Sequence, residues 1–124
     1  MAELLPGLDI TVQPVIDVPE IPAEDHYVPT VGLKKALLLT LHHEMFPYSQ
    51  RRAHGLDLDH TQPYVPGCHG QTRVGNLAPL GRKAHRAKTA RHWRVDQPRP
   101  GQFYWFSPLG YRYETTPTGT RMLA

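Results

Sequence analysis

The chain has 124 residues, of which 40% are hydrophobic, and it contains 13 prolines, 10 glycines and one cysteine. This length allows one domain with a small core, and the single cysteine, Cys68, excludes an internal disulfide. No apolar run approaches the roughly 18 residues needed to cross a bilayer, and the N-terminus lacks the basic and apolar regions of a signal peptide. We therefore expect a loop-rich cytoplasmic protein with no membrane partner.

The net charge of +3 is unevenly distributed along the chain. Residues 1–33 contain acidic residues but no lysine or arginine, whereas basic residues gather between positions 82 and 94: Arg82, Lys83, Arg86, Lys88, Arg91 and Arg94. A polyanion such as nucleic acid is a natural ligand for a basic segment of this kind. The alternative is a solvated basic face without a ligand, and the charge pattern alone does not decide between them.

The first 30 residues carry prolines at positions 6, 14, 19, 22 and 29, between short β-branched pieces. Proline fixes φ and removes a backbone donor, so neither a helix nor a central strand can extend far in this segment. We interpret residues 1–30 as an acidic, proline-rich, flexible arm. Residues 31–118 then form the folded domain, and residues 119–124 form a C-terminal tail.

A helix is predicted from about Val31 to His43, because good helix formers follow Gly32 without another glycine or proline. Its leucines fall at helical spacing and predict one apolar side that packs against the core: Leu33, Leu37, Leu38 and Leu41. His42 and His43 are adjacent, and adjacent helical positions point about a hundred degrees apart. They therefore make a poor pair of metal ligands.

Apolar and acidic residues alternate from Leu56 to His60, which indicates a half-buried strand. Successive side chains of a strand point to opposite faces. We therefore expect Leu56 and Leu58 to face the core, and Asp57 and Asp59 to share the other face. A loop rich in glycine and proline is predicted to follow, over residues 62–73.

A second helix is predicted from Leu77 to Thr89, with Asn76 as its N-cap and Pro79 in its first turn. Gly81 would lie inside this helix and would cost about 1 kcal/mol relative to alanine. Three short strands are predicted next, at residues 92–96, 103–107 and 111–115. Their aromatic residues are expected to form core and cross-strand pairs rather than a base-stacking platform: Trp93, Phe103, Trp105, Tyr111 and Tyr113.

Phosphodiester hydrolysis requires a base that activates water and ligands for a cation that stabilises the transition state. Residues in the middle of the chain have side chains of both kinds. His60 suits the base, since an unperturbed imidazole has a pKa of about 6.5 and exchanges a proton near neutral pH. Asp59 and His85 can hold a divalent cation from separate elements and leave coordination positions open. Asn76 would hold the helix or the loop by hydrogen bonds.

The order of these residues, in the motifs DLDHTQPY from Asp57, GNLAPL from Gly75 and HRAKT from His85, resembles that of HNH endonucleases. Together with the segment HWRVDQPRPGQFYWFSPLGYRYETTP, it is similar to the C-terminal HNH domain of a family of actinobacterial repeat proteins. In that family a longer domain of unknown function precedes the HNH domain. The resemblance covers residues 27–117 and implies an α+β fold, in which an HNH-like ββα-metal unit is preceded by a helix and followed by an antiparallel β-meander.

The resemblance also implies an activity, the metal-dependent hydrolysis of DNA phosphodiester bonds with Mg²⁺ or Mn²⁺ as the cofactor. His60 and Asn76 would be catalytic residues, and Asp59 and His85 would bind the metal. The DNA phosphates would be bound by a basic set that positions the substrate without reading its sequence: Arg82, Lys83, Arg86, Lys88 and Arg91.

The chain departs from this family at a structural zinc site. Aligned by the family motifs, the ligand positions fall at Glu44, Ser49, Gly81 and Ala84, none of which supplies a thiolate or an imidazole. We therefore expect no structural zinc. Either the remaining core holds the catalytic geometry, or the loss of about ten kcal/mol of zinc binding leaves a loosened remnant that binds nucleic acid without cleaving it. A third alternative is a protein-interaction module with no nucleic-acid role.

Overall fold

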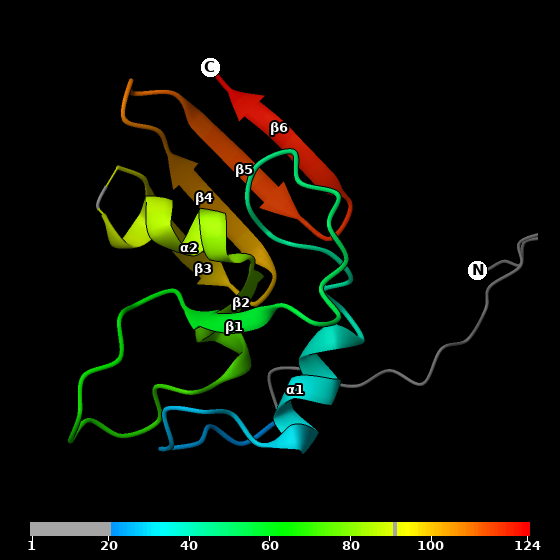
Figure 1. The fold of residues 1–124 in the computed structure, drawn as a ribbon, viewed down its shortest axis with the longest axis vertical. Helices are drawn as coiled ribbons and strands as arrows, with labels where there is room; N and C mark the ends of the chain where they lie inside the picture. The colour runs from blue at the N-terminus through cyan, green and yellow to red at the C-terminus, as the bar shows by residue number, and fades with distance from the viewer. Residues whose placement is uncertain (1–20, 91) are drawn as a thin grey trace, which may run out of the picture.

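The computed structural model describes residues 21–90 and 92–124 (Figure 1). The elements follow in the order α1 (Val31–Leu38), β1 (Asp57–His60), the short 3-10 helix η2 (Val74–Asn76), β2 (Leu77–Leu80), α2 (Arg82–Thr89), β3 (Arg94–Arg99), β4 (Gln102–Phe106), β5 (Arg112–Thr116) and β6 (Gly119–Leu123). This is a mixed α/β fold with two short helices and two antiparallel sheets. Within these residues, no helix has the length and apolar character that crossing a membrane requires.

Strands β1 and β2 form a two-stranded antiparallel sheet, in which Asp57 lies opposite Leu80 and His60 opposite Leu77. The prediction of a helix was wrong for Leu77–Leu80, because these four residues are all buried and form a strand covered on both faces. Helix α2 begins only at Arg82, with Gly81 as its N-cap. Asn76 is therefore not the N-cap of this helix.

Strands β3 to β6 form a four-stranded antiparallel meander in sequential order. The three predicted strands are confirmed, and residues 119–123, which were expected to be a tail, add the fourth strand. Phe103 and Trp105 are fully buried, and Trp93 and Tyr113 pack against the core. The expected core position was wrong for Tyr111, which lies in the turn before β5 and is 53% exposed.

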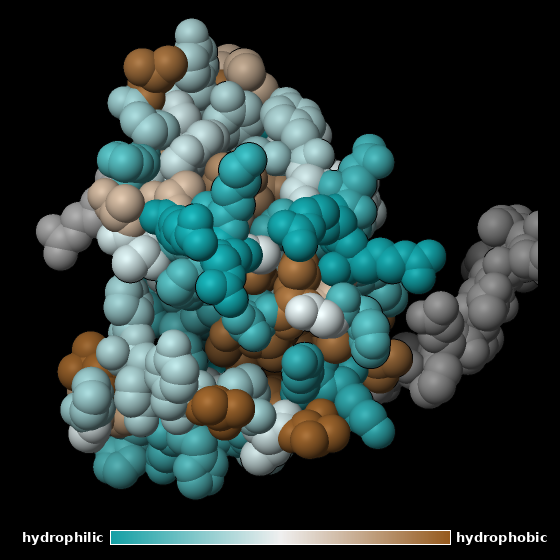
Figure 2. Space-filling model, viewed as in Figure 1, coloured by the Kyte–Doolittle hydropathy of each residue, from teal (hydrophilic) through white to brown (hydrophobic). Residues whose placement is uncertain are grey.

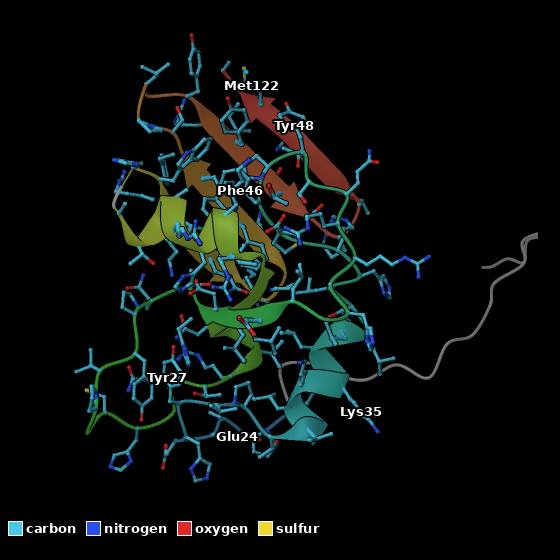
Figure 3. The ribbon with its side chains drawn as sticks, in the orientation of Figure 1. Glu24, Tyr27, Lys35, Phe46, Tyr48 and Met122 are labelled. Atoms are coloured by element: carbon cyan, nitrogen blue, oxygen red, sulfur yellow. The ribbon has the colours of Figure 1, made fainter. Side chains whose placement is uncertain are left out.

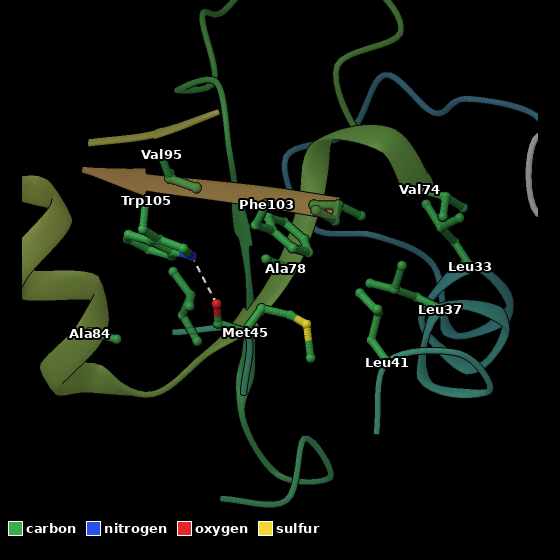
Figure 4. Packing of buried hydrophobic residues seen from close by; sticks show 12 residues of the cluster. Leu33, Leu37, Leu41, Met45, Val74, Ala78, Ala84, Val95, Phe103 and Trp105 are labelled. Atoms are coloured by element: carbon green, nitrogen blue, oxygen red, sulfur yellow. Dashed lines mark hydrogen bonds between the residues drawn. The ribbon is translucent and has the colours of Figure 1, made fainter. Parts of the chain in front are cut away.

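One apolar cluster joins α1, the two sheets and α2 (Figure 4). From the N-terminal half it includes Leu33 and Leu37 of α1 and the following Leu41, as their helical spacing predicted, whereas Leu38 is half-buried. Helix α1 ends at Leu38, five residues earlier than predicted, and His43 then pairs with Arg52 in an isolated β-bridge. The chain after α1 is thus extended where it enters the core.

A hydrogen bond links the C-terminal sheet to the segment that supports β2. The indole Nε1 of Trp105 donates to the backbone oxygen of Met45 over 2.9 Å (Figure 4). The backbone N–H of Met45 in turn donates to the oxygen of Pro79 in β2, over 3.1 Å. The buried tryptophan of β4 therefore fixes the position of the small sheet.

The N-terminal segment of residues 21–30 lies against the connection between β1 and β2. Glu24 and Thr72 exchange two backbone hydrogen bonds of 2.7 and 3.1 Å, and the Asp25 carboxylate accepts from the backbone N–H of Gly70 over 2.6 Å. These bonds tie residues 21–30 to the domain. The remainder of the predicted arm, residues 1–20, lies outside the described residues.

Candidate active site

The candidate active site lies at the junction of β1 and α2, where three side chains meet at one carboxylate. Asp59 Oδ1 is 3.1 Å from His85 Nε2, and Asp59 Oδ2 is 2.6 Å from Lys88 Nζ. His85 and Lys88 are three positions apart in α2 and therefore share the side of the helix that faces Asp59. The structure thus brings together the two predicted metal ligands, Asp59 and His85, which are 26 positions apart in the chain.

Lys88 lies inside this site rather than on the outer surface of α2. Its side chain is only 13% exposed, and its ammonium donates to the Asp59 carboxylate and to the backbone oxygen of His60. The sequence predicted that Lys88 would contact phosphate with the other basic residues of α2. The structure instead gives its charge a carboxylate partner within the protein, so that Lys88 neutralises the charge of Asp59.

His60 is buried at the end of β1, and its hydrogen bonds determine its tautomer. The hydroxyl of Thr72 donates its single hydrogen to the backbone oxygen of His26, so its oxygen must accept the bond from His60 Nε2, which is 2.9 Å long. His60 therefore carries its proton on Nε2. Among the described residues, no side-chain or backbone group is hydrogen-bonded to Nδ1, and this nitrogen has the free lone pair of a base.

The surroundings of His60 also favour its neutral form. Burial lowers the pKa of the imidazole below its usual value of 6.5, and the positive charge of Lys88 lowers it further, whereas the Asp59 carboxylate acts in the opposite direction. The result of these effects is a pKa below 6.5. At neutral pH the imidazole is therefore unprotonated and able to accept a proton.

Asn76 is buried and holds the two ends of the β1–β2 connection together. Its Oδ1 accepts from the backbone N–H of Gln62 over 2.8 Å, and its Nδ2 donates to the backbone oxygens of Gln71 and Gln62 over 2.9 and 3.3 Å. The backbone oxygen of Asn76 also accepts from Thr61 over 2.9 Å. The side chain thus closes the long connection directly behind His60. Of the two roles predicted for Asn76, holding the helix or holding the loop, this is the second.

The other basic residues of α2 lie on its outer side. Arg82, Lys83 and Arg86 are exposed, and Figure 2 shows hydrophilic side chains gathered over this helix. Arg91 lies outside the described residues. Arg94 belongs to β3, where its guanidinium lies 4.6 Å from the centre of the Phe106 ring. Three of the five predicted phosphate contacts therefore form one exposed basic surface.

A groove with a volume of about 580 Å³ runs along the candidate site. Asp57 and Asp59 line the groove, and as alternate residues of β1 they lie on the same face of the strand, as predicted. Lys34 of α1 also lines it, as do Arg82 and Arg86 of α2. The groove therefore combines acidic side chains from the strand with basic side chains from both helices, which suits a cation and phosphate groups.

The residues at the junction fit a divalent cation that has only two protein ligands. A site with more protein ligands is absent, because no group of three or more His, Cys, Asp or Glu side chains among the described residues could hold a metal ion. Asp59 and His85 supply one oxygen and one nitrogen, a set that leaves coordination positions for water and phosphate. Lys88 would have to release Asp59 Oδ2 for the cation to use both carboxylate oxygens.

Three of the four positions aligned with zinc ligands are joined by hydrogen bonds. The buried carboxylate of Glu44 accepts from the Ser49 hydroxyl over 2.6 Å and from the backbone N–H of Gly81 over 2.5 Å. The prediction that Gly81 weakens the helix was wrong, because this residue precedes α2. A Cβ at this position would lie 2.7 Å from the Arg51 guanidinium and 2.9 Å from the Glu44 carboxylate, so a larger residue would require both side chains to shift.

Sequence reasoning missed two residues that the structure places beside His60. Thr72 fixes the tautomer of His60, and Tyr27 lies with its ring centre 5.2 Å from that of His60. Both contacts depend on how the β1–β2 connection and the N-terminal segment fold back on β1. No periodicity or short motif in the sequence indicates them.

Comparison with known proteins finds sequence relatives in Mycobacterium tuberculosis. Uncharacterized protein Rv2100 of strain H37Rv is 32% identical over 123 residues, which are 98% of this chain and 22% of that protein. The same values hold for Uncharacterized protein MT2160 of strain CDC 1551. This chain therefore spans about a fifth of the length of these curated relatives. No protein-family model matches the chain, and no solved structure matches it.

Proposed function

We propose that the protein is an HNH-type endonuclease that hydrolyses DNA phosphodiester bonds with Mg²⁺ or Mn²⁺. In this proposal β1, β2 and α2 form an HNH-like ββα-metal unit. Two antiparallel strands joined by a long connection are followed directly by a helix, and the predicted site residues converge where the first strand meets that helix. This arrangement supports the resemblance that the sequence motifs suggested.

The roles of the side chains follow from their contacts. His60 accepts the proton of the attacking water at Nδ1, while Thr72 holds the imidazole in the required tautomer. Asp59 and His85 would hold the divalent cation, which when bound would stabilise the charge that develops on the phosphate. Asn76 fixes the connection behind His60, and Arg82 and Arg86 bind the DNA backbone.

The observation that carries the proposal is the state of His60. A buried, neutral imidazole with its proton fixed on Nε2 and a free Nδ1, adjacent to the carboxylate of the cation site, is the arrangement that a general base requires. Only one of the two ring nitrogens of His60 is used in a hydrogen bond within the described residues, which leaves the other available to accept a proton.

Nicking of supercoiled plasmid by the purified chain tests this proposal, in Mg²⁺ or Mn²⁺ and beside an EDTA control. The His85→Ala variant removes one metal ligand whose side chain is half exposed, so the fold should persist. We expect this variant to need a higher metal concentration for the same rate, whereas His54→Ala, which changes an exposed histidine outside the site, should need the wild-type concentration. Equal nicking in EDTA would contradict the metal role.

A second candidate function is binding of nucleic acid without cleavage, and the position of Lys88 favours it. The ammonium group already supplies a cation to Asp59, so the site is electrically satisfied without a metal. The basic surface of α2 would still bind a phosphate backbone. A folded chain that binds DNA with strong salt dependence, and nicks plasmid in none of these metals, would select this candidate.

A further inference from the structure

We propose that the groove beside the candidate site binds a single-stranded segment of nucleic acid, with an unpaired base stacked on Tyr27. This inference deepens the proposed function and rests on it for the class of ligand. It adds the form of the substrate, because an aromatic stacking residue requires a base whose face is available. In a continuous duplex both faces of an internal base are already covered by its neighbours.

Tyr27 is an aromatic side chain held in place while its ring stays accessible. It is 61% exposed, although its ring centre lies only 5.2 Å from that of His60 and 5.3 Å from that of Tyr64. The plane of its ring is tilted by 31° from that of His60, so one face of the phenol is directed toward the imidazole. Much of the remaining ring surface faces solvent at the groove.

The segment that carries Tyr27 is fixed on both sides of this residue. Before it, the Asp25 carboxylate accepts from the backbone N–H of Gly70 over 2.6 Å, and the Asp25 backbone oxygen accepts from the Tyr64 hydroxyl over 3.0 Å. After it, Thr30 donates its backbone N–H to the Glu24 carboxylate over 2.9 Å. Figure 3 shows Tyr27 and Glu24 on the side of β1 away from α2. A rigid aromatic platform of this kind loses little entropy when a base stacks on it.

Tyr27 lies in the same groove as the cations that would contact the phosphates. Lys34 of α1 lines the same groove, as do Arg82 and Arg86 of α2. Within the described residues, none of these three cations forms a salt bridge with a carboxylate. A volume of about 580 Å³ is within the usual range of ligand pockets and can take one or two nucleotides. Stacking on an aromatic beside a cationic track is the usual way in which proteins hold single strands.

The test is a binding titration in EDTA, so that cleavage plays no part. The probe is a DNA strand of about ten nucleotides that contains the fluorescent base 2-aminopurine, used as a single strand and as a duplex. We expect binding to quench the single strand, and Tyr27→Ala to weaken its affinity roughly tenfold with loss of the quenching. Tyr27→Phe should keep both, because it retains the ring. Duplex affinity should be the same in all variants.

The matched control is Tyr111→Ala, since Tyr111 is also exposed but lies before β5, outside the groove. It should leave both affinities unchanged. Single-strand affinity within twofold of wild type in a folded Tyr27→Ala variant, or an equal loss for the duplex, would overturn the inference. If plasmid is nicked while Tyr27 has no effect, this inference fails and the proposed function stands. If binding depends on Tyr27 but no metal supports nicking, hydrolysis fails and the stacking site stands.

Discussion

The two sheets of this protein differ in what they bury. The four-stranded sheet of β3 to β6 covers its core side with Val95, Phe103 and Trp105, and its one buried polar residue is Thr115. The β1–β2 sheet and the segments around it bury a series of polar side chains: Glu44, His60, Thr61, Thr72 and Asn76. Apolar burial stabilises both regions, since Leu77 and Leu80 of β2 belong to the same core, but the second region also depends on hydrogen bonds that orient its polar groups. We therefore regard the four-stranded sheet as the scaffold and the β1–β2 sheet with its neighbouring segments as the region of the candidate site.

The largest expected effect comes from the tryptophan that connects the two regions. Trp105→Ala removes a fully buried side chain and the hydrogen bond to Met45, and we expect it to lower the free energy of unfolding by about 3–5 kcal/mol. Urea denaturation followed by circular dichroism measures this loss. Tyr111→Ala, on the exposed turn before β5, should change the free energy by less than about 0.5 kcal/mol. Equal losses would contradict the assignment of this sheet as the scaffold.

A smaller loss of stability is expected from Asn76→Ala. The substitution removes three hydrogen bonds and leaves the backbone groups of Gln62 and Gln71 without their partner, at a cost of about 2 kcal/mol. Because these bonds close the connection behind His60, amide hydrogen exchange should increase between residues 61 and 76 and stay unchanged in β3 to β6. Uniform acceleration over both regions would show that the two are not energetically separate.

The fold could be predicted from the sequence where local patterns determine structure. The alternation from Leu56 to His60 identified β1, and the leucine spacing identified the buried side of α1. The pattern failed at residues 77–80, because a short apolar run has the same composition in a buried strand as in a buried helix. Residues 119–123 were missed since a polar edge strand is recognised mainly by its pairing with β5.

The candidate site was predictable only in its residue types. The motifs indicated Asp59, His60, Asn76 and His85, and the structure brings Asp59 and His85 into contact. The position of Lys88 between the carboxylate and the backbone of β1 depends on how α2 packs, which no spacing specifies. The same holds for Thr72 and Tyr27, whose contacts with His60 join segments far apart in the chain.

The one buried polar group of the scaffold sheet predicts a gain in stability. Among the described residues, the hydroxyl of Thr115 is buried without a hydrogen-bond partner. Thr115→Val replaces this hydroxyl by a methyl group of similar size, so we expect the free energy of unfolding to increase by about 1 kcal/mol. A shift of the urea midpoint to higher concentration, with plasmid nicking unchanged, would agree with this expectation. A destabilised variant would show that the hydroxyl has a partner in solution.

The smallest expected effect is a dependence of stability on pH through His60. Its pKa is lower in the folded protein than the usual 6.5, so above that value neither the folded nor the unfolded state is protonated and the residue contributes nothing. As the pH falls below about 6.5, the unfolded chain binds a proton that the folded protein resists, and stability declines until the folded pKa is passed. Comparison of urea midpoints with His60→Gln isolates this contribution. Identical pH profiles of wild type and variant would contradict the burial of an unprotonated imidazole.

The central claim of this account is that His60 is the general base of a metal-dependent nuclease. The most direct measurement is the rate at which wild type, His60→Ala and His54→Ala nick supercoiled plasmid in Mn²⁺, with circular dichroism to confirm that each chain is folded. We expect His60→Ala to be slower by a factor on the order of a hundred or more, and His54→Ala to match wild type. Nicking by His60→Ala at the wild-type rate would contradict the claim.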